Sequence, residues 1–244
     1  MIDTHAHLNF SQFDKDRKEI IDQCLGKGIS LINVGTDYQN SEQAVALAKE
    51  YEKGVWASIG LHPLDVNQGF DYEKYKSLGR EKIKAIGETG LDYWFKPGKE
   101  KKEKQQNVFL KHIVLAEELK LPLIIHCRVA FADVYSILKE TKVKGVLHCF
   151  TGALADLEKF LALGYFIGFN GIIFKMDLKK AIAETPLERM LLETDCPFLS
   201  PPGFDQRNSP LSLEIIGKEI ARIKGISLEE VLTKTESNAL GLFK

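Results

Sequence analysis

The sequence predicts a single (β/α)8 TIM barrel that spans residues 1–244, and three observations favour this fold. Short β-branched or apolar runs alternate with longer stretches of helical periodicity along the whole chain. Eight such pairs can be recognised, and a chain of 244 residues has the length of one α/β barrel. Most of the short runs end in Gly, His, Glu, Asn or Asp, and polar side chains at strand ends are typical of sites in this fold.

The predicted strands are short and rich in β-branched or apolar residues. In chain order they are Ile2–Thr4, Ser30–Val34, Val55–Ile59, Ile83–Gly87, Leu123–His126, Gly145–His148, Tyr165–Phe169 and Met190–Thr194. Helical periodicity predicts helices near 14–27, 39–53, 71–80, 101–120, 130–141, 154–163, 177–185 and 211–224, with one or two more at the C-terminal end. Parallel strands joined by helices need cover on both faces, and right-handed crossovers favour a closed barrel over an open sheet.

No internal repeat, long linker or change of composition divides the chain, so one domain is expected. The segment 96–104, which combines Pro, Gly, Lys and Glu, is predicted to be a loop that enters a solvated helix. The alternative for this segment is contact with phosphates.

Composition predicts a soluble globular protein, since 44% of the residues are hydrophobic and 27% are charged. The formal net charge of −1 excludes a global basic field that would draw the molecule onto nucleic acid or an anionic membrane. It does not exclude a nucleic acid substrate, because bound metal ions or a few arginines can create a local positive site.

The N-terminal sequence has neither a basic segment nor an apolar leader, and no apolar run approaches the roughly 20 residues that cross a bilayer. These features predict a cytoplasmic protein without a membrane partner. The four cysteines, Cys24, Cys127, Cys149 and Cys196, are too scattered for a disulfide scaffold or a structural zinc site. They are expected to be buried thiols.

The strongest functional signal is a set of histidines and carboxylates at the predicted strand ends. His5 and His7 follow the first strand, and His126 and His148 end the fifth and sixth. Glu88 follows the fourth strand and Asp195 follows the eighth. In a (β/α)8 barrel all these positions face one mouth, where active sites of this fold are built.

Four imidazoles and two carboxylates exceed the ligands of one tetrahedral ion, and a carboxylate can bridge two ions. We therefore expect a pair of divalent cations, whether zinc, manganese or magnesium. The hypothesis places His5, His7 and Asp195 on the first ion, His126 and His148 on the second, and Glu88 between them. Asp195 is also expected to accept a proton from the attacking water.

Other polar residues near the predicted mouth are candidates for substrate contact. His62 is expected to contact substrate or leaving group rather than metal. Arg128, two residues after His126, is a candidate for an anionic oxygen or for a structural salt bridge. Lys175, Arg207 and Asn208 follow the seventh and eighth strands, where this fold often binds phosphate, but are equally typical of ordinary loops. His112 is assigned no function.

The order of these motifs resembles the TatD-family metal-dependent hydrolases, or TatD-type deoxyribonucleases, within the amidohydrolase-like barrels. The resemblance spans nearly the whole chain and rests on segments 2–8 (IDTHAHL), 59–63 (IGLHP), 86–93 (IGETGLDY), 125–128 (IHCR), 147–152 (LHCFTG), 192–197 (LETDCP) and 238–243 (NALGLF). It implies the same six metal-binding positions, His5, His7, Glu88, His126, His148 and Asp195. It also implies hydrolysis of phosphodiester bonds in DNA, often from a 3′ end.

The loop after the eighth strand departs from the family pattern, which has a basic Arg-Gly-Lys-Arg-Asn-Glu-Pro-like stretch. This chain reads PPGFDQRNSP at 201–210, with Ser209 in place of the usual acid and at least one basic position missing. The substrate range is therefore open.

The leading hypothesis is a two-metal phosphodiesterase that acts on DNA ends or single-stranded DNA, with Glu88, Asp195 and His62 as catalytic residues and without an obligate protein partner. His62, Arg128 and Arg207 are the expected substrate contacts. The alternative is hydrolysis of an amide or ester, such as deacylation of aminoacyl-tRNA, because the same activated water attacks carbonyl groups. A barrel that only binds a metal or a partner is the non-enzymatic alternative.

Overall fold

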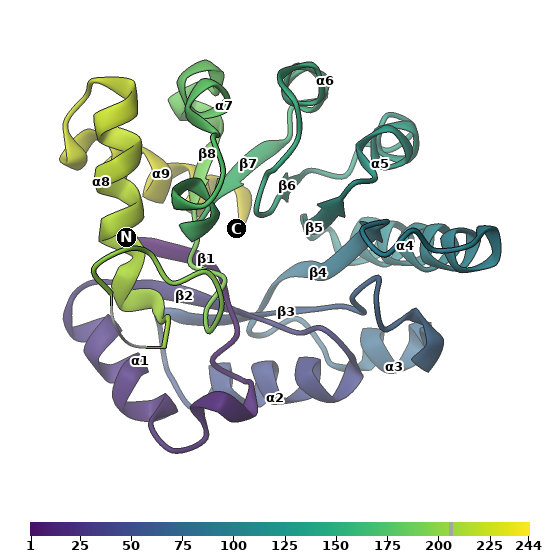
Figure 1. Ribbon diagram of the computed structural model, residues 1–244. Helices are drawn as coiled ribbons and strands as arrows, with labels where there is room; N and C mark the ends of the chain where they lie inside the picture. Colours follow the sequence, from purple (N-terminus) through teal and green to yellow (C-terminus); the bar gives the residue numbers. More distant parts are fainter. Residues whose placement is uncertain (205–206) are drawn as a thin grey trace.

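A computed structural model describes residues 1–204 and 207–244 of the chain. Eight parallel strands neighbour one another in chain order, from β1 to β8. The strands surround a common centre and the helices form an outer ring (Figure 1). This arrangement confirms the predicted (β/α)8 TIM barrel. Asp205 and Gln206, in the loop that departs from the family pattern, lie outside the described residues.

The observed strands agree with the predicted ones within a few residues, except that the fourth is longer. They are β1 (Ile2–Ala6), β2 (Ser30–Val34), β3 (Val55–Ile59), β4 (Ile83–Asp92), β5 (Leu123–Arg128), β6 (Gly145–Leu147), β7 (Phe166–Phe169) and β8 (Met190–Leu192). β4 continues beyond Gly87 because its residues Thr89–Asp92 pair with Ile125–Arg128 of β5. The fourth strand therefore carries Thr89–Asp92 within the sheet rather than on a loop.

One α-helix follows each strand from β1 to β7, and two follow β8, so the described residues form nine α-helices. They are α1 (Arg17–Gly26), α2 (Tyr38–Lys49), α3 (Tyr72–Ser77), α4 (Lys99–Leu119), α5 (Phe131–Leu138), α6 (Leu154–Ala162), α7 (Lys179–Glu184), α8 (Leu213–Lys224) and α9 (Leu228–Leu242). Segment 96–104 does form a loop that enters α4 at Lys99. Among the described residues, no helix is both long and apolar enough to cross a membrane.

The barrel closes between β1 and the chain that follows β8. Ala6 forms a parallel bridge with Cys196, and the Asp195 N–H donates to the His5 carbonyl over 2.8 Å. β8 ends at Leu192, two residues before the predicted end, because the Asp3 carboxylate accepts from the Thr194 N–H and hydroxyl at 3.0 and 2.6 Å. Where β1 and β8 meet, hydrogen bonds to the Asp3 side chain thus replace the regular backbone hydrogen bonds between strands.

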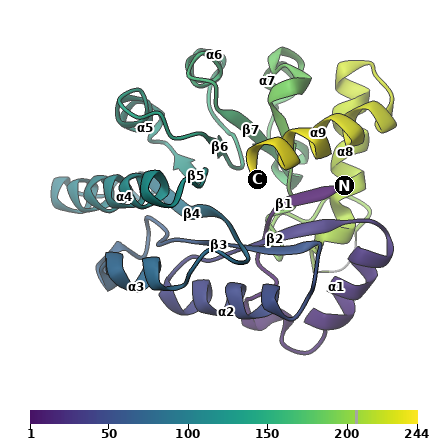
Figure 2. The ribbon, with the colours of Figure 1, turned by 180° about the vertical axis from the view of Figure 1, so that it is seen from behind.

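The barrel interior is apolar at the end where the strands begin. Six strands contribute buried side chains to one inner cluster, and such residues can meet only inside the ring. The cluster comprises Ile2, Ile32, Val34, Ala85, Ile124, Val146, Leu191, Ala239 and Phe243. Its last two members belong to the C-terminal segment, and Figure 2 shows α9 lying across this end of the barrel. The closing sequence NALGLF therefore seals the bottom, where this fold places stability rather than chemistry.

Two β-bulges turn polar residues toward the opposite end of the barrel. β1 advances from Asp3 to Ala6 while β2 advances only from Leu31 to Asn33. An extra residue in a strand reverses the alternation of its side chains. Ile2 can therefore point into the inner cluster while His5 points to the mouth. β4 has the same irregularity beside β5, between Ile86 and Thr89, and it re-aims Glu88.

Candidate metal centre

The structure brings all six predicted metal-binding residues together at the C-terminal end of the barrel. They project from the ends of five strands and lie in three overlapping groups of possible ligands. The groups are His5 with Glu88 and His148; His5 with His7 and Asp195; and His62 with Glu88 and His126. His62, expected to contact substrate, thus lies among the predicted ligands.

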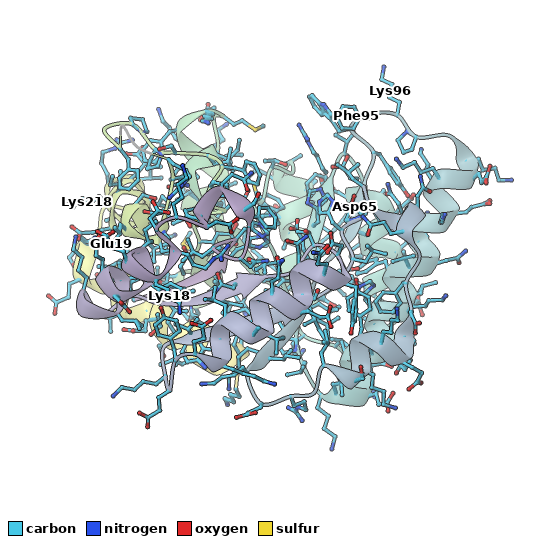
Figure 3. The ribbon with its side chains drawn as sticks, turned by 90° about the horizontal axis from the view of Figure 1, so that it is seen from below. Lys18, Glu19, Asp65, Phe95, Lys96 and Lys218 are labelled. Carbon is cyan, nitrogen blue, oxygen red and sulfur yellow. The ribbon has the colours of Figure 1, made fainter. Side chains whose placement is uncertain are left out.

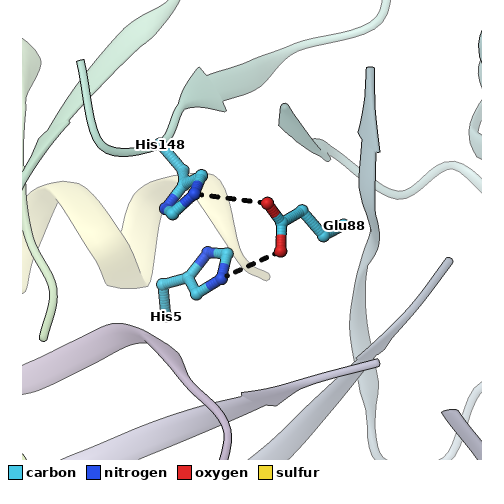
Figure 4. Close-up of side chains that lie close together, drawn as sticks. All are labelled: His5, Glu88 and His148. Carbon is cyan, nitrogen blue, oxygen red and sulfur yellow. Dashed lines mark ion pairs between the residues drawn. The ribbon is translucent and has the colours of Figure 1, made fainter. Parts of the chain in front are cut away.

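Glu88 occupies the middle of the centre, with one carboxylate oxygen toward each side. Its Oε2 lies 3.4 Å from His5 Nε2, and its Oε1 lies 3.3 Å from His148 Nε2. Figure 4 shows both contacts from the single carboxylate. Oε1 also lies 2.8 Å from His126 Nδ1. A carboxylate placed in this way can bridge two ions, as the sequence suggested.

The side of the centre nearest β1 and β8 is formed by His5, His7 and Asp195. The two Nε2 atoms lie 3.1 Å apart, and Asp195 Oδ1 lies 3.4 Å from His7 Nε2 and 3.7 Å from His5 Nε2. Two ligands of one ion, each about 2.0–2.2 Å from it, stand roughly 3.0–3.6 Å apart. The spacing of these three atoms therefore suits one shared cation.

In three of the histidines, the ring nitrogen that points away from the centre (the outer nitrogen) lies next to a hydrogen-bond acceptor. His7 Nδ1 faces the Val34 carbonyl at 2.9 Å, and His148 Nδ1 faces Glu193 Oε1 at 3.1 Å. His126 uses Nε2 in the same way, 3.0 Å from Asp92 Oδ2. In the neutral rings these nitrogens carry the hydrogen, so each inner nitrogen keeps a lone pair. This support of ligating histidines by a second acceptor is the usual pattern around bound metals.

The other ring nitrogens, which point into the centre, lie next to carboxylate oxygens. A lone pair on nitrogen and an anionic oxygen repel each other unless a proton or a cation lies between them. Burial lowers the pKa of His148, but the negative charges of Glu193 and Glu88 raise it more, so the net pKa lies well above its usual value. His126 shows the same opposition, and the hydrogen bonds to Asp92 and Glu88 leave its pKa raised. The centre thus attracts positive charge, and its residues fit divalent cations.

Both central carboxyl groups are ionised at neutral pH. Burial raises the pKa of Glu88, but the surrounding histidines oppose it, and the net pKa is well below its usual value. For Asp195, burial is likewise outweighed by the hydrogen bond from His7 and by the charges of His148 and His5. Anionic carboxylates are required both to bind a metal and to accept a proton.

Sequence reasoning did not assign roles to Glu193 and Asp92, although both support the centre. Glu193 is fully buried and also accepts from the Cys149 N–H at 2.7 Å and from Asn170 Nδ2 at 3.1 Å. The signal for Glu193 was its position directly after β8, two residues before Asp195. Asp92 lies four residues after Glu88 and ends β4. The predicted strand ended at Gly87, so Asp92 was not recognised as a residue at a strand end.

Two glycines make room for this support. A side chain on Gly90 would meet the His126 carbonyl oxygen at 2.0 Å, and the residue has a φ of +137°. A side chain on Gly168 would meet Glu193 Oε2 at 2.4 Å. Glycine is therefore required at both positions for β4 and the buried glutamate to approach the histidines so closely.

His62 differs from the other histidines in the direction of its proton. Its Nδ1 accepts from the Leu64 N–H at 3.2 Å, so in the neutral ring the hydrogen is on Nε2. That Nε2 lies 3.3 Å from His126 Nδ1 and 3.5 Å from Glu88 Oε1. Burial lowers the pKa of His62 to about 4, which keeps the ring neutral. An N–H donor directed into the centre favours contact with a substrate oxygen.

The remaining predicted contacts are dispersed around the mouth. Arg128 is exposed, and its guanidinium lies 4.2 Å from the centre of the Trp94 ring. Arg207 donates from Nη2 to both carboxylate oxygens of Asp16, at 2.7 and 2.8 Å, which holds it beside α1. Asn208 is buried and donates to the Thr194 carbonyl, so it shapes the loop, whereas Lys175 is exposed.

The residues without a predicted role behave accordingly. His112 is buried in α4, donates from Nδ1 to the Val108 carbonyl and accepts at Nε2 from the Leu61 N–H. The four cysteines are free; Cys24, Cys127 and Cys196 are buried, and Cys149 is partly exposed. Burial raises the pKa of the Cys24 thiol to about 12, so it is no thiolate at neutral pH.

A barrel with a buried carboxylate between histidine groups at its C-terminal mouth defines the class of metal-dependent hydrolases. The family model described as TatD related DNase matches residues 2–244. The chain therefore belongs to the TatD-related DNase family, which confirms the resemblance inferred from the motifs, and it is a metal-dependent enzyme.

Curated relatives match this chain over its full length. The uncharacterized metal-dependent hydrolase YabD of Bacillus subtilis is 38% identical, with 100% of this chain and 99% of the relative covered. The 3′-5′ ssDNA/RNA exonuclease TatD of Erwinia tasmaniensis is 36% identical, with 100% and 99% covered. This chain is thus about equally similar in sequence to a relative named as a nuclease and to one whose name gives no substrate.

Solved structures show the same architecture. The TatD homologue YjjV of Escherichia coli K12 is 29% identical, with a TM-score of 0.87 and 100% and 97% of the two chains covered. A TatD-family hydrolase from Entamoeba histolytica is 26% identical, with a TM-score of 0.89 and the same coverage.

Proposed function

We propose that this enzyme hydrolyses phosphodiester bonds at the 3′ end of single-stranded DNA with two divalent cations. The observation that carries the chemistry is the Glu88 carboxylate, with one oxygen toward His5 and the other toward His126 and His148. Membership of a DNase family and a relative named as a 3′-5′ ssDNA/RNA exonuclease support the substrate.

The first ion in this proposal is held by His5, His7 and Asp195, and the second by His126 and His148. Glu88 is the shared ligand. When bound, such a pair of ions polarises the phosphoryl group and acidifies water. Histidine ligands suit zinc, whereas carboxylates and phosphoryl chemistry suit manganese or magnesium.

Asp195 is the proposed proton acceptor. Its side chain retains 16% exposure, whereas the Glu88 side chain retains 5%, so Asp195 is the more accessible carboxylate. Its lowered pKa keeps it anionic at neutral pH. A carboxylate at the edge of the centre can orient an entering water and accept its proton while Glu88 stays between the histidine groups.

His62 is proposed to donate from Nε2 to a phosphate or leaving-group oxygen. The Leu64 N–H fixes the opposite nitrogen as an acceptor, so the donor direction does not depend on the substrate. Arg128 and Arg207 remain proposed substrate contacts. For Arg207, substrate must compete with the exposed pair to Asp16. The cytoplasmic location predicted from the N-terminal sequence stays a prediction.

The test uses a single-stranded oligonucleotide labelled near its 3′ end, the same strand with a blocked 3′ end, and an aminoacyl-tRNA in parallel. We expect nucleotides to be released from the free 3′ end only, with loss of activity in chelator and recovery with added metal. Metal content and activity should both fall in Glu88→Ala and His126→Ala. Metal-dependent turnover of the acyl bond alone would replace this proposal with the alternative hydrolase.

A further inference from the structure

The mouth of the barrel carries an unusual share of exposed apolar side chains. Within the described residues, nine large hydrophobic side chains are exposed, and five of these follow the ends of β4, β5, β7 and β8. The five are Trp94, Phe95, Val129, Met176 and Phe198. Phe95 projects from the body of the molecule (Figure 3). Exposed apolar side chains concentrated at one end of a fold are typical of a binding surface.

The backbone of Trp94 is linked to the metal centre by two hydrogen bonds in series. The backbone N–H of Trp94 donates to Asp92 Oδ1 at 2.9 Å, and Asp92 Oδ2 contacts His126 Nε2 at 3.0 Å. The Tyr93 N–H donates to the Arg128 carbonyl at 2.8 Å, which joins the ends of β4 and β5. Trp94 is 54% exposed, but its backbone is held at a fixed place beside the centre.

Arg128 makes this exposed ring part of a composite surface. Its guanidinium lies over the indole with 4.2 Å between Cζ and the ring centroid. Among the described residues, its side chain has no ion-pair partner. The surface thus offers an aromatic face together with an available cation, and planar Arg is suited to both phosphate and ring contact.

We infer that Trp94 and Arg128 form a stacking platform for one nucleobase of a single-stranded substrate and for its adjacent phosphate. Unpaired strands present base faces and phosphates in alternation, whereas a duplex encloses its base faces within the stack. The net charge of −1 leaves recognition to such local contacts. This inference rests on the proposed function, since it names how the substrate strand is held.

The kinetic test combines Trp94→Leu with oligonucleotides that carry one abasic position, scanned through the last few nucleotides before the 3′ end. Loss of stacking should raise KM about 5- to 150-fold on the normal strand. On the strand lacking the stacked base, wild type and variant should have similar KM values, because the two changes remove the same contact. Trp94→Phe, which keeps a ring, should restore most of the affinity. Leu240→Ala, an equally exposed change on α9, is the matched control.

Fluorescence provides a second measurement that does not require cleavage. The chain has two tryptophans, and Trp56 packs against the inner cluster, so Trp94 is the exposed one. In Glu88→Gln, an oligonucleotide should quench Trp94 emission, and Trp94→Phe should abolish the quenching while binding persists by anisotropy. If Trp94→Leu has the same KM as the wild type, or if the oligonucleotide binds without quenching the emission, the stacking proposal is wrong.

The two proposals fail separately. If the wild type cleaves no oligonucleotide, the proposed function fails and the quenching experiment alone decides whether Trp94 stacks on a base. If the wild type cleaves oligonucleotides and Trp94→Leu behaves as Leu240→Ala does, the platform fails and the nuclease stands. Equal effects on normal and abasic strands also contradict stacking and indicate a surface for another partner.

Discussion

The two ends of this barrel are built from the same eight strands but from opposite kinds of side chain. At the bottom, apolar residues such as Ile124 and Val146 meet Phe243 of the C-terminal segment. Two residues further along β5 and beyond β6, His126 and His148 face Glu88. Alternation in a strand keeps both sets inside the ring, so one strand serves packing at its start and chemistry at its end.

This difference separates stability from activity along the barrel axis. The bottom is covered by α9 and gains from apolar burial, whereas the mouth concentrates buried charge that is satisfied only by protons or cations. Substitutions at the mouth should therefore affect metal binding and turnover, and substitutions at the bottom should affect the free energy of unfolding.

The largest effect is expected for Glu88→Gln. The change keeps the shape of the side chain but removes the negative charge that faces both histidine groups. We expect kcat/KM on an oligonucleotide to fall about 10³-fold, the equivalent of several kcal/mol of lost electrostatic stabilisation. Metal content of the purified protein should fall with it, while circular dichroism remains that of the wild type. Activity within about tenfold of wild type would contradict a central role for Glu88.

Phe243→Ala should have the opposite profile. Phe243 is 7% exposed and packs in the inner cluster, so its truncation should lower the free energy of unfolding by about 3–5 kcal/mol. The matched control is Leu240→Ala, because Leu240 lies in the last turn of α9, three residues before Phe243, but is 56% exposed and should change stability by less than about 0.5 kcal/mol. Denaturant unfolding measures both. If both variants lose a similar amount of unfolding free energy, or if kcat changes in the folded Phe243→Ala enzyme, stability and activity are not separated along the barrel axis.

The sequence predicted His126 and His148 more securely than His5 and Glu88. For the former pair, regular alternation from Ile124 and Val146 already places the histidines inside the ring. For His5 and Glu88, the correct orientation depends on bulges in β1 and β4, which alternation alone does not reveal. These two residues were assigned from their position at predicted strand ends and from motif resemblance, without the bulges that orient their side chains.

Long-range partners were beyond prediction. Arg207 was a candidate phosphate contact or an ordinary loop residue, and its pair with Asp16, near the start of the chain, was not predicted. Trp94 was given no role from the sequence, and its exposure and its contact with Arg128 appear only once β4 and β5 are aligned. Sequence patterns describe local structure and strand ends, but such contacts depend on how separate loops meet.

The smallest effect concerns a titratable residue away from the mouth. Burial lowers the pKa of His112 from 6.5 to about 4. Between these values the unfolded chain binds more protons than the folded one, so this residue's contribution to stability is present above pH 6.5 and is lost as pH falls toward 4. The difference corresponds to at most about 3 kcal/mol. His112→Gln retains a donor for Val108 and an acceptor for Leu61 but cannot titrate.

Urea unfolding of wild type and His112→Gln at several pH values between 7 and 4 measures this contribution directly. Other groups titrate in both proteins, so their effects cancel in the difference between the two curves. We expect the wild type to lose about 2–3 kcal/mol more than the variant over this range. Parallel curves would show that His112 is protonated in the folded state as readily as in the unfolded chain. Because His112 lies outside the centre, its substitution should shift this stability curve without moving the pH profile of kcat, which separates its protonation from that of the histidines at the mouth.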